Sequence, residues 1–248
     1  MLLGEPPPTN YDLHFNFGPF LVRIHPFFWL VTLIMGVNSR DAISILSWIV
    51  ACFASILIHE LGHAVTMRWY GESPRVLLYG MGGLAMSDGG YARGWGGNRR
   101  GGRTAWEQIV ISFAGPAAGF LFALVILVFV VAMKGQVAFR VPSVQSPAFW
   151  SAKLANFRLL ELVSDLLYIN FAWGLVNLLP IFPLDGGQIA RQLLVLAEPG
   201  SGYRRSLGLS VATAAAMSFV GFAMWKSMYV GFMFAWLAVE SYMSMQRR

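Results

Sequence analysis

Four long segments of this chain carry almost no charge, and they restrict its possible folds more than any other feature. They lie at about 42–70, 105–133, 159–180 and 206–225. Each is close to or above the roughly 20 residues with which an α-helix crosses a bilayer. Only 12% of all residues are charged, whereas a soluble domain is about a quarter charged. The sequence therefore predicts an α-helical polytopic membrane protein.

Two further apolar segments are expected to cross the membrane. Residues 25–39 are short for a span, and residues 227–246 are uncharged as far as Val239 and continue through Glu240. With these two, the chain is expected to have about six transmembrane helices. Residues 1–248 are predicted to form a single domain, because no polar segment is long enough to fold separately.

Short membrane-associated β-strands are expected at two places. Residues 11–17 alternate apolar and polar side chains, the period of a half-buried strand, and residues 20–24 can return beside them after Gly18-Pro19. Residues 1–24 are therefore assigned to N-terminal strands. A second strand-like stretch, RVLLYGMGGLAM, covers 75–86. The glycine- and arginine-rich residues 88–104 that follow it predict an exposed loop.

The net charge of +6 does not indicate a nucleic-acid partner, because the basic residues concentrate in the polar connections. With six spans, the side that holds both termini and the 88–104 loop receives twelve of the 18 Lys and Arg residues. Basic connections stay in the cytoplasm, so the termini and this loop are expected there. The compact architecture favours a prokaryotic plasma (inner) membrane, with the lipid bilayer as surroundings.

The segment 42–70 contains three ionisable residues at membrane depth: His59, Glu60 and His63. Such residues are rare in spans and usually line a cavity or bind something. On a helix His59 and His63 project from the same face, where two imidazoles can hold one Zn²⁺. Glu60 lies beside that face and can accept a proton from an activated water molecule. The alternative is a pair of helix histidines with an ion-paired glutamate and no metal.

A catalytic zinc site usually has three protein ligands. The third is expected to be a carboxylate, since neither of the other two histidines lies beyond the start of the first span. Asp185 is favoured because Pro180 and Pro183 must break the helix before it, and broken backbone at membrane depth lines a cavity or is buried in protein. Asp185 could also cap a helix beginning near Gln188, which is compatible with ligation. The candidate carboxylates are Glu72, Glu107, Glu161, Asp165 and Asp185.

At these residues the sequence resembles the site-2 protease family of intramembrane zinc metalloproteases. IHELGHAVTMRWYG resembles the zinc-binding helix of that family, and NLLPIFPLDGGQI resembles its second signature, whose Asp supplies the third ligand. YGMGGLAM is similar to its glycine-rich strand, and FAGPAAGF to its Gly-Pro segment. That segment often continues to an Asn where this chain has Gly119, so we assign no catalysis to Gly119. Without a PDZ or CBS-like addition, a compact core-only member is expected.

The resemblance implies proteolysis within the membrane, acting on a membrane-protein substrate with a transmembrane helix. It implies one Zn²⁺ per chain, held by His59, His63 and Asp185, with Glu60 as the general base. Asn177 could donate a hydrogen bond to the substrate carbonyl, or could join two helices instead. A divalent-metal transporter and a catalytically inactive scaffold of the same fold are the alternatives.

The glycine-rich strand is the expected substrate-binding element. A helical substrate must become locally extended before its backbone can be cut, and a free strand edge can pair with such a segment. Glycines permit close backbone approach. A plain turn in a membrane-embedded hairpin is the alternative. The predicted substrate-binding residues are Gly80, Gly82 and Gly83.

Overall fold

The computed structural model describes residues 5–37, 41–80, 82–87, 103–139, 150–153 and 156–246. Most of the predicted 88–104 loop therefore lies outside the described residues. The elements, in chain order, are β1 (Leu13–Phe17), β2 (Phe20–Ile24), α1 (Pro26–Gly36), α2 (Ala42–Trp69), β3 (Pro74–Tyr79), β4 (Gly82–Ser87), α3 (Ala105–Ala132), β5 (Gln136–Phe139), β6 (Trp150–Lys153), α4 (Phe157–Tyr168), the π-helix η1 (Ile169–Trp173), α5 (Gly174–Asn177), α6 (Asp185–Ala197), α7 (Gly202–Phe219), the π-helix η2 (Val220–Met224) and α8 (Met228–Gln246).

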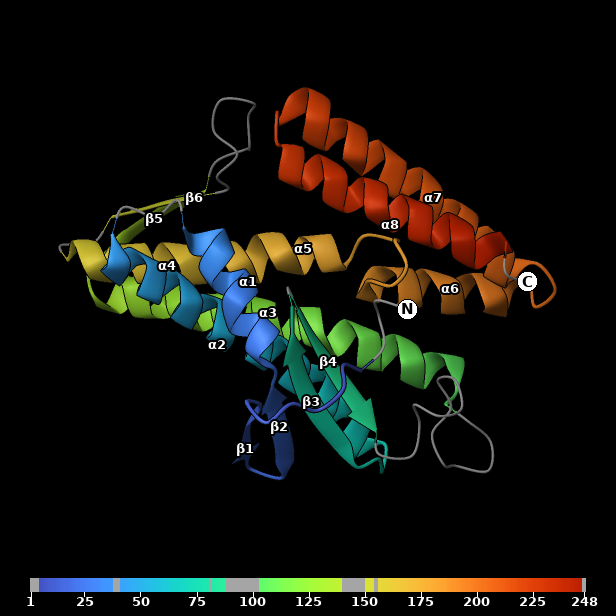
Figure 1. Ribbon diagram of the computed structural model, residues 1–248, viewed down its shortest axis with the longest axis horizontal. Helices are drawn as coiled ribbons and strands as arrows, with labels where there is room; N and C mark the ends of the chain where they lie inside the picture. Colours follow the sequence, from blue (N-terminus) through green and yellow to red (C-terminus); the bar gives the residue numbers. More distant parts are fainter. Residues whose placement is uncertain are drawn as a thin grey trace.

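A four-stranded sheet in the order β1-β2-β3-β4 packs against α2 (Figure 1). The β1–β2 and β3–β4 pairs are antiparallel, and both were predicted as strands. The central pair, β2 and β3, is parallel. Parallel neighbours need a crossover connection, and α1 and α2 supply it. The strand β4 therefore lies at one edge of the sheet, next to the helix that carries the two histidines.

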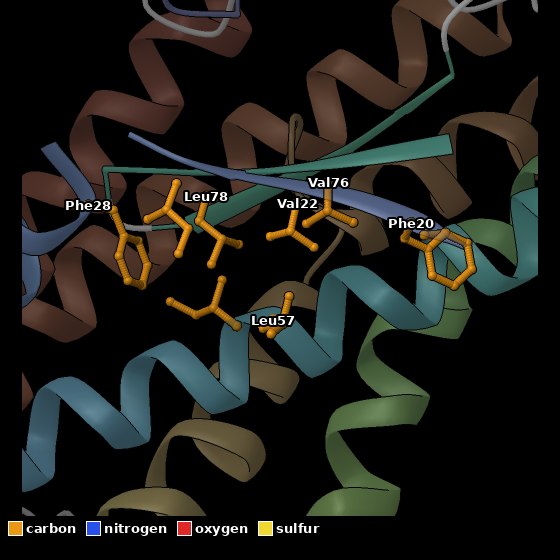
Figure 2. Close-up of a cluster of buried hydrophobic side chains, with 9 residues drawn as sticks. Phe20, Val22, Phe28, Leu57, Val76 and Leu78 are labelled. Carbon is orange, nitrogen blue, oxygen red and sulfur yellow. The ribbon is translucent and has the colours of Figure 1, made fainter. Parts of the chain in front are cut away.

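An apolar core holds the sheet on α2. Val22 and Val76 from the sheet point toward α2, as does Leu78, and they meet Leu57 from the helix and Phe28 from α1 (Figure 2). All five side chains are buried. Burying a side chain of this size contributes about 1.5–3 kcal/mol. This packing holds β3 on α2, and with it the paired strand β4, which also contacts α2.

Among the described residues, four helical stretches are long and apolar enough to cross a membrane. They are Ala42–Trp69, Ala105–Ala132, Phe157–Asn177 and Gly202–Met224, which agree with four of the predicted spans. The other two predicted spans are also helical, but α1 has 11 residues and rises only about 16 Å. The 19-residue α8 ends in polar residues, which lower its mean hydropathy. The total of six spans therefore stays a prediction.

The remaining helices complete the molecule. Within α3, Pro116 is buried without ending the helix. The helices α7 and α8 lie side by side (Figure 1), and α7 also packs against α6. A small two-stranded sheet, β5-β6, lies between α3 and α4 in the chain and was not predicted from the sequence.

Helices α2 and α3 approach each other closely. A Cβ atom added to Gly62 of α2 would lie 2.4 Å from the backbone oxygen of Ala114 in α3, so only glycine fits there. At the ends of the same two helices, Arg103 pairs with Glu72 through two hydrogen bonds of 2.6 Å each. Arg103 also donates to Gln108 at 3.0 Å. Both contacts hold α3 in register with α2.

Replacing Arg103 with Ala is expected to destabilise the protein by about 3 kcal/mol. Both side chains of the pair are largely buried, and removing one partner leaves the Glu72 charge buried and unpaired. Unfolding in detergent, followed by circular dichroism, measures this loss. Arg158→Ala is the matched control, because its ion pair with Asp41 is exposed and such pairs contribute little. Equal losses in the two variants would contradict the role given to Arg103.

Candidate metal centre

The two histidines of α2 project into the interior of the molecule. Their Nε2 atoms lie 3.2 Å apart, as expected for residues one helical turn apart on one face. The Nδ1 atom of His63 lies 2.6 Å from the backbone oxygen of Ile111 in α3. This carbonyl can accept the Nδ1 proton, which leaves Nε2 of His63 with a free lone pair. A histidine oriented in this way is ready to bind a metal.

Asp185 reaches both imidazoles from the other half of the chain. Its Oδ2 lies 3.1 Å from Nε2 of His59, and its Oδ1 lies 3.4 Å from Nε2 of His63. The helix α5 ends at Asn177 and α6 begins at Asp185, so the chain is interrupted where the prolines predicted it. The suggestion that Asp185 caps a helix near Gln188 is wrong, because α6 begins at Asp185 itself and Leu184 is the N-cap.

The glycines after Asp185 explain how the carboxylate is brought inward. A Cβ atom on Gly186 would lie 2.1 Å from the backbone oxygen of Leu178, and one on Gly187 would lie 2.4 Å from the backbone oxygen of Ile181. The first turn of α6 is thus packed directly on the preceding loop. A side chain at either position would push Asp185 away from the histidines.

The spacing of these atoms fits a zinc ion. Two ligands about 2.05 Å from zinc in a tetrahedral arrangement lie about 3.3 Å from each other. The three observed separations are 3.1, 3.2 and 3.4 Å. Two imidazoles and one carboxylate are also a known donor set of catalytic zinc sites. The ligand atoms of His59, His63 and Glu60 also lie within 4.8 Å of one another, but we favour Asp185 as the third ligand because each of its oxygens faces one imidazole.

Glu60 lies beneath the edge strand β4 and is buried. A Cβ atom added to Gly83 would lie 2.2 Å from Cγ of Glu60. The backbone N–H of Ala85 also interacts with the Glu60 carboxylate. The strand β4 therefore covers this carboxylate and holds it beside the histidines.

The free edge of β4 turns its backbone groups toward this site. The hairpin register pairs Tyr79 with Gly82 and Leu78 with Gly83. In an antiparallel pair, hydrogen-bonded and non-hydrogen-bonded positions alternate, and the residues that flank a two-residue hairpin loop are a hydrogen-bonded pair. Gly83 and Ala85 are thus non-hydrogen-bonded positions, whose N–H and C=O groups point away from β3. The N–H of Ala85 is already used by Glu60. In the described part of the chain, the backbone groups of Gly83 and the C=O of Ala85 are therefore the ones available to an added strand.

The three predicted glycines therefore have different positions. Gly83 is in direct contact with Glu60, whereas a Cβ atom on Gly82 would meet nothing within 4 Å. Gly80 has a φ of +57°, which glycine adopts most readily, and its nearest neighbour is the ring of Phe27. Gly80 thus lies in the turn and Gly83 lies against Glu60, and the binding of substrate by these glycines stays a prediction.

Replacing Gly83 with Ala is expected to lower kcat by about 10²-fold, because the new methyl group must displace Glu60 by more than an ångström. Gly82→Ala is expected to behave like the wild type, since the space beside it is open. Cleavage kinetics and zinc content of both variants test this. Zinc should remain bound in both proteins, and similar kcat values for the two variants would contradict the assigned contact.

The other predicted polar residues lie as follows. Asn177 is the last residue of α5, is buried and lines the same cavity as the histidines. Three of the alternative carboxylates are engaged elsewhere: Glu72 with Arg103, Glu107 in the capping box of α3, and Glu161 with Arg158. These contacts make them poor candidates for the third ligand.

The site opens into a cavity of about 980 Å³. Its wall includes the histidines, Glu60, Asp185 and the edge of β4, together with apolar residues of α8. Sequence reasoning missed several polar residues of this wall, and only Ser55 carried a signal, because it precedes His59 by one helical turn. The missed polar residues of the wall that are buried are Ser55, Gln108, Ser112, Asn170 and Gln188.

Comparison with known proteins agrees with this geometry. The profile of peptidase family M50 matches residues 47–219, which contain both predicted signatures. The chain belongs to peptidase family M50. With its four apolar helices, this M50 member is an integral membrane protein. The resemblance to the site-2 protease family is thereby confirmed.

Individual relatives support the same assignment. The chain is 27% identical over 191 residues to "Zinc metalloprotease MJ0392" of Methanocaldococcus jannaschii, an alignment of 74% of this chain and 42% of that protein. A Mycobacterium tuberculosis protein and a Synechocystis protein, both with zinc metalloprotease in their names, are 30% and 27% identical over 66% and 57% of this chain. The alignments span only 34% and 30% of these two proteins, so this M50 chain matches less than half the length of its curated relatives.

A solved structure confirms the fold. The "Site-2 Protease from Methanocaldococcus jannaschii" superposes with a TM-score of 0.56 and 21% sequence identity, over 94% of each chain. At this sequence identity, the match supports the fold and no statement about function. The predicted fold class, a helical membrane protein with short strands beside the histidine helix, is therefore confirmed.

Proposed function

We propose that this chain is a zinc-dependent intramembrane endopeptidase that cleaves the transmembrane segments of single-span membrane proteins. The observation that supports it most is the convergence of Asp185 with His59, 126 positions away in the sequence, and with His63. Glu60 lies beside these three residues in one cavity. A metal site assembled in this way, with a carboxylate left over for proton transfer, suits hydrolysis.

The ligands and the base have separate tasks in this proposal. His59, His63 and Asp185 hold the ion, and bound Zn²⁺ supplies Lewis-acid chemistry that makes water reactive near neutral pH. Glu60 accepts a proton from the attacking water molecule as the water oxygen adds to the carbonyl carbon of the substrate. Glu60 then returns this proton to the amine nitrogen as the C–N bond breaks.

The substrate is held by β4 and Asn177. An unwound segment of the substrate pairs with the outward N–H and C=O groups of Gly83 and with the C=O of Ala85, which adds a strand to the sheet. This pairing lays the scissile carbonyl beside Glu60. The amide of Asn177 donates a hydrogen bond to the carbonyl oxygen, where negative charge develops during the reaction.

The surroundings follow from the charge distribution. We place the protein in a prokaryotic plasma membrane with the termini and the 88–104 loop in the cytoplasm, because twelve of the 18 Lys and Arg residues then lie inside. The count assumes six spans. Accessibility of single introduced cysteines at the two ends of the chain measures this orientation.

Removal of the metal tests the proposed function. The protein purified in detergent is expected to cleave a single-span substrate, to lose this activity completely with a chelator, and to regain it with added Zn²⁺. The same protein in sealed vesicles is expected not to move Zn²⁺ across the bilayer. Zinc flux without cleavage would favour the metal transporter, and bound zinc with neither cleavage nor flux would favour the inactive scaffold.

A further inference from the structure

Asn170 is a polar residue of the cavity wall to which the proposed mechanism gives no role. It lies on η1, is 4% exposed, and lines the cavity that holds the metal site. A π-helical segment is rare and often marks a functional site. A buried amide at membrane depth is also unfavourable unless its polar atoms are satisfied. The position therefore suggests a specific partner.

The orientation of the Asn170 amide is fixed by two hydrogen bonds. Its Nδ2 donates to Oγ of Ser55 at 2.7 Å and to the backbone oxygen of Leu166 at 2.8 Å. A backbone oxygen can only accept, so the nitrogen must be the atom on this side. Both amide hydrogens are used, whereas in the described part of the chain no donor reaches Oδ1.

The free Oδ1 atom has space in front of it. A Cβ atom added to Gly119 of α3 would lie 3.4 Å from this oxygen, so a side chain at position 119 would occupy that space. Gly119, Ser55 and Asn170 all line the cavity. Ser55 also precedes His59 by four residues on α2, which places it about 6 Å further along the helix axis. The residue with the unused acceptor therefore contacts α2 one helical turn before His59.

We propose that Asn170 is a substrate-binding residue whose Oδ1 accepts a hydrogen bond from a backbone N–H of the unwound substrate segment. This inference rests on the proposed function. An extended segment has two edges of N–H and C=O groups, and β4 satisfies only one of them. Unpaired backbone groups at membrane depth are strongly unfavourable, so the second edge needs acceptors from the helices. Asn170 supplies one, with Ser55 as the residue that positions it.

Replacing Asn170 with Leu removes this acceptor while keeping the same number of side-chain heavy atoms and the same branching. The expected result is a KM about 3- to 10-fold higher, the size of one neutral hydrogen bond, with zinc content unchanged. Ser218→Ala is the matched control, because Ser218 makes a buried hydrogen bond to the Gly231 oxygen and is not part of the cavity wall. If the wild type cleaves normally and Asn170→Leu has the wild-type KM, the role given to Asn170 is wrong, whereas the proposed protease function stands.

Ester substitution in the substrate identifies the hydrogen bond itself. Synthetic substrates in which one backbone N–H at a time is replaced by an ester oxygen are bound to the inactive Glu60→Gln protein, and Kd is measured. One ester position is expected to weaken binding about 3- to 10-fold when Asn170 is present and to have no effect with Asn170→Leu or Asn170→Ala. Either of these two variants can be used for the comparison, provided that it retains zinc. An ester pattern that is identical with and without Asn170 overturns the proposal.

Discussion

Glu60→Gln is expected to lower kcat by about 10²- to 10⁴-fold, the usual contribution of a positioned general base, and to leave zinc bound. The amide has the same size as the carboxylate and fits beneath Gly83, where the spacing permits no larger group. It cannot accept the proton of the attacking water. The three proposed ligands are unchanged, so the metal should remain. Single-turnover cleavage and zinc content measure both quantities in the same preparation.

Glu161→Gln is the matched control for this variant. It removes one carboxylate from the membrane-spanning part of the chain, where Glu161 pairs with Arg158, and it should keep both activity and zinc. This control also tests one of the alternative third ligands. If Glu60→Gln cleaves the substrate as fast as the wild type, Glu60 is not the base and the proposed mechanism is wrong. If the Glu60→Gln protein loses its zinc, the result would indicate that Glu60 is a metal ligand.

The fold could be predicted from sequence wherever a periodic pattern was present. Long apolar segments predicted four helices that the described residues contain. Alternation predicted β1, and the turn at Gly18-Pro19 predicted β2 as its return strand. The parallel pairing of β2 with β3 could not be predicted, because it depends on how α1 and α2 cross the sheet. The β5–β6 pair lies in a segment whose sequence has neither strong alternation nor an apolar run.

The site was predictable to the extent that its residues carry chemistry. His59, His63 and Asp185 were selected by residue type, and the structure brings them together. Asn177 lines the cavity as expected, although its catalytic role stays a prediction. Asn170 was missed because a single asparagine in an apolar segment has no distinctive neighbours in the sequence. Its contact with Ser55 joins residues 115 positions apart, which only the folded chain reveals.

Gly115→Ala is expected to weaken zinc binding strongly in a protein that still folds, and the contact responsible for this effect cannot be seen in the sequence. Gly115 lies on α3 directly opposite the two imidazoles. A Cβ atom there would lie 2.2 Å from Nε2 of His63 and 2.8 Å from Nε2 of His59. Ordinary contacts are about 3.5 Å, so at least one ring must move by about 1 Å. Zinc sites tolerate only about 0.2 Å.

His63 has little freedom to avoid the added methyl group, because its Nδ1 is held by the Ile111 oxygen and its side chain is buried. Zinc affinity should therefore fall at least about 100-fold, the upper range for changes that only disturb ligand orientation. Gly208→Ala in α7 is the control, since a methyl group there meets nothing within 4 Å. It should retain zinc, and circular dichroism should show both variants equally helical. A Gly115→Ala protein that binds zinc as tightly as the wild type would mean that the two Nε2 atoms do not face the ion, because no metal held between them could tolerate a carbon atom at that distance.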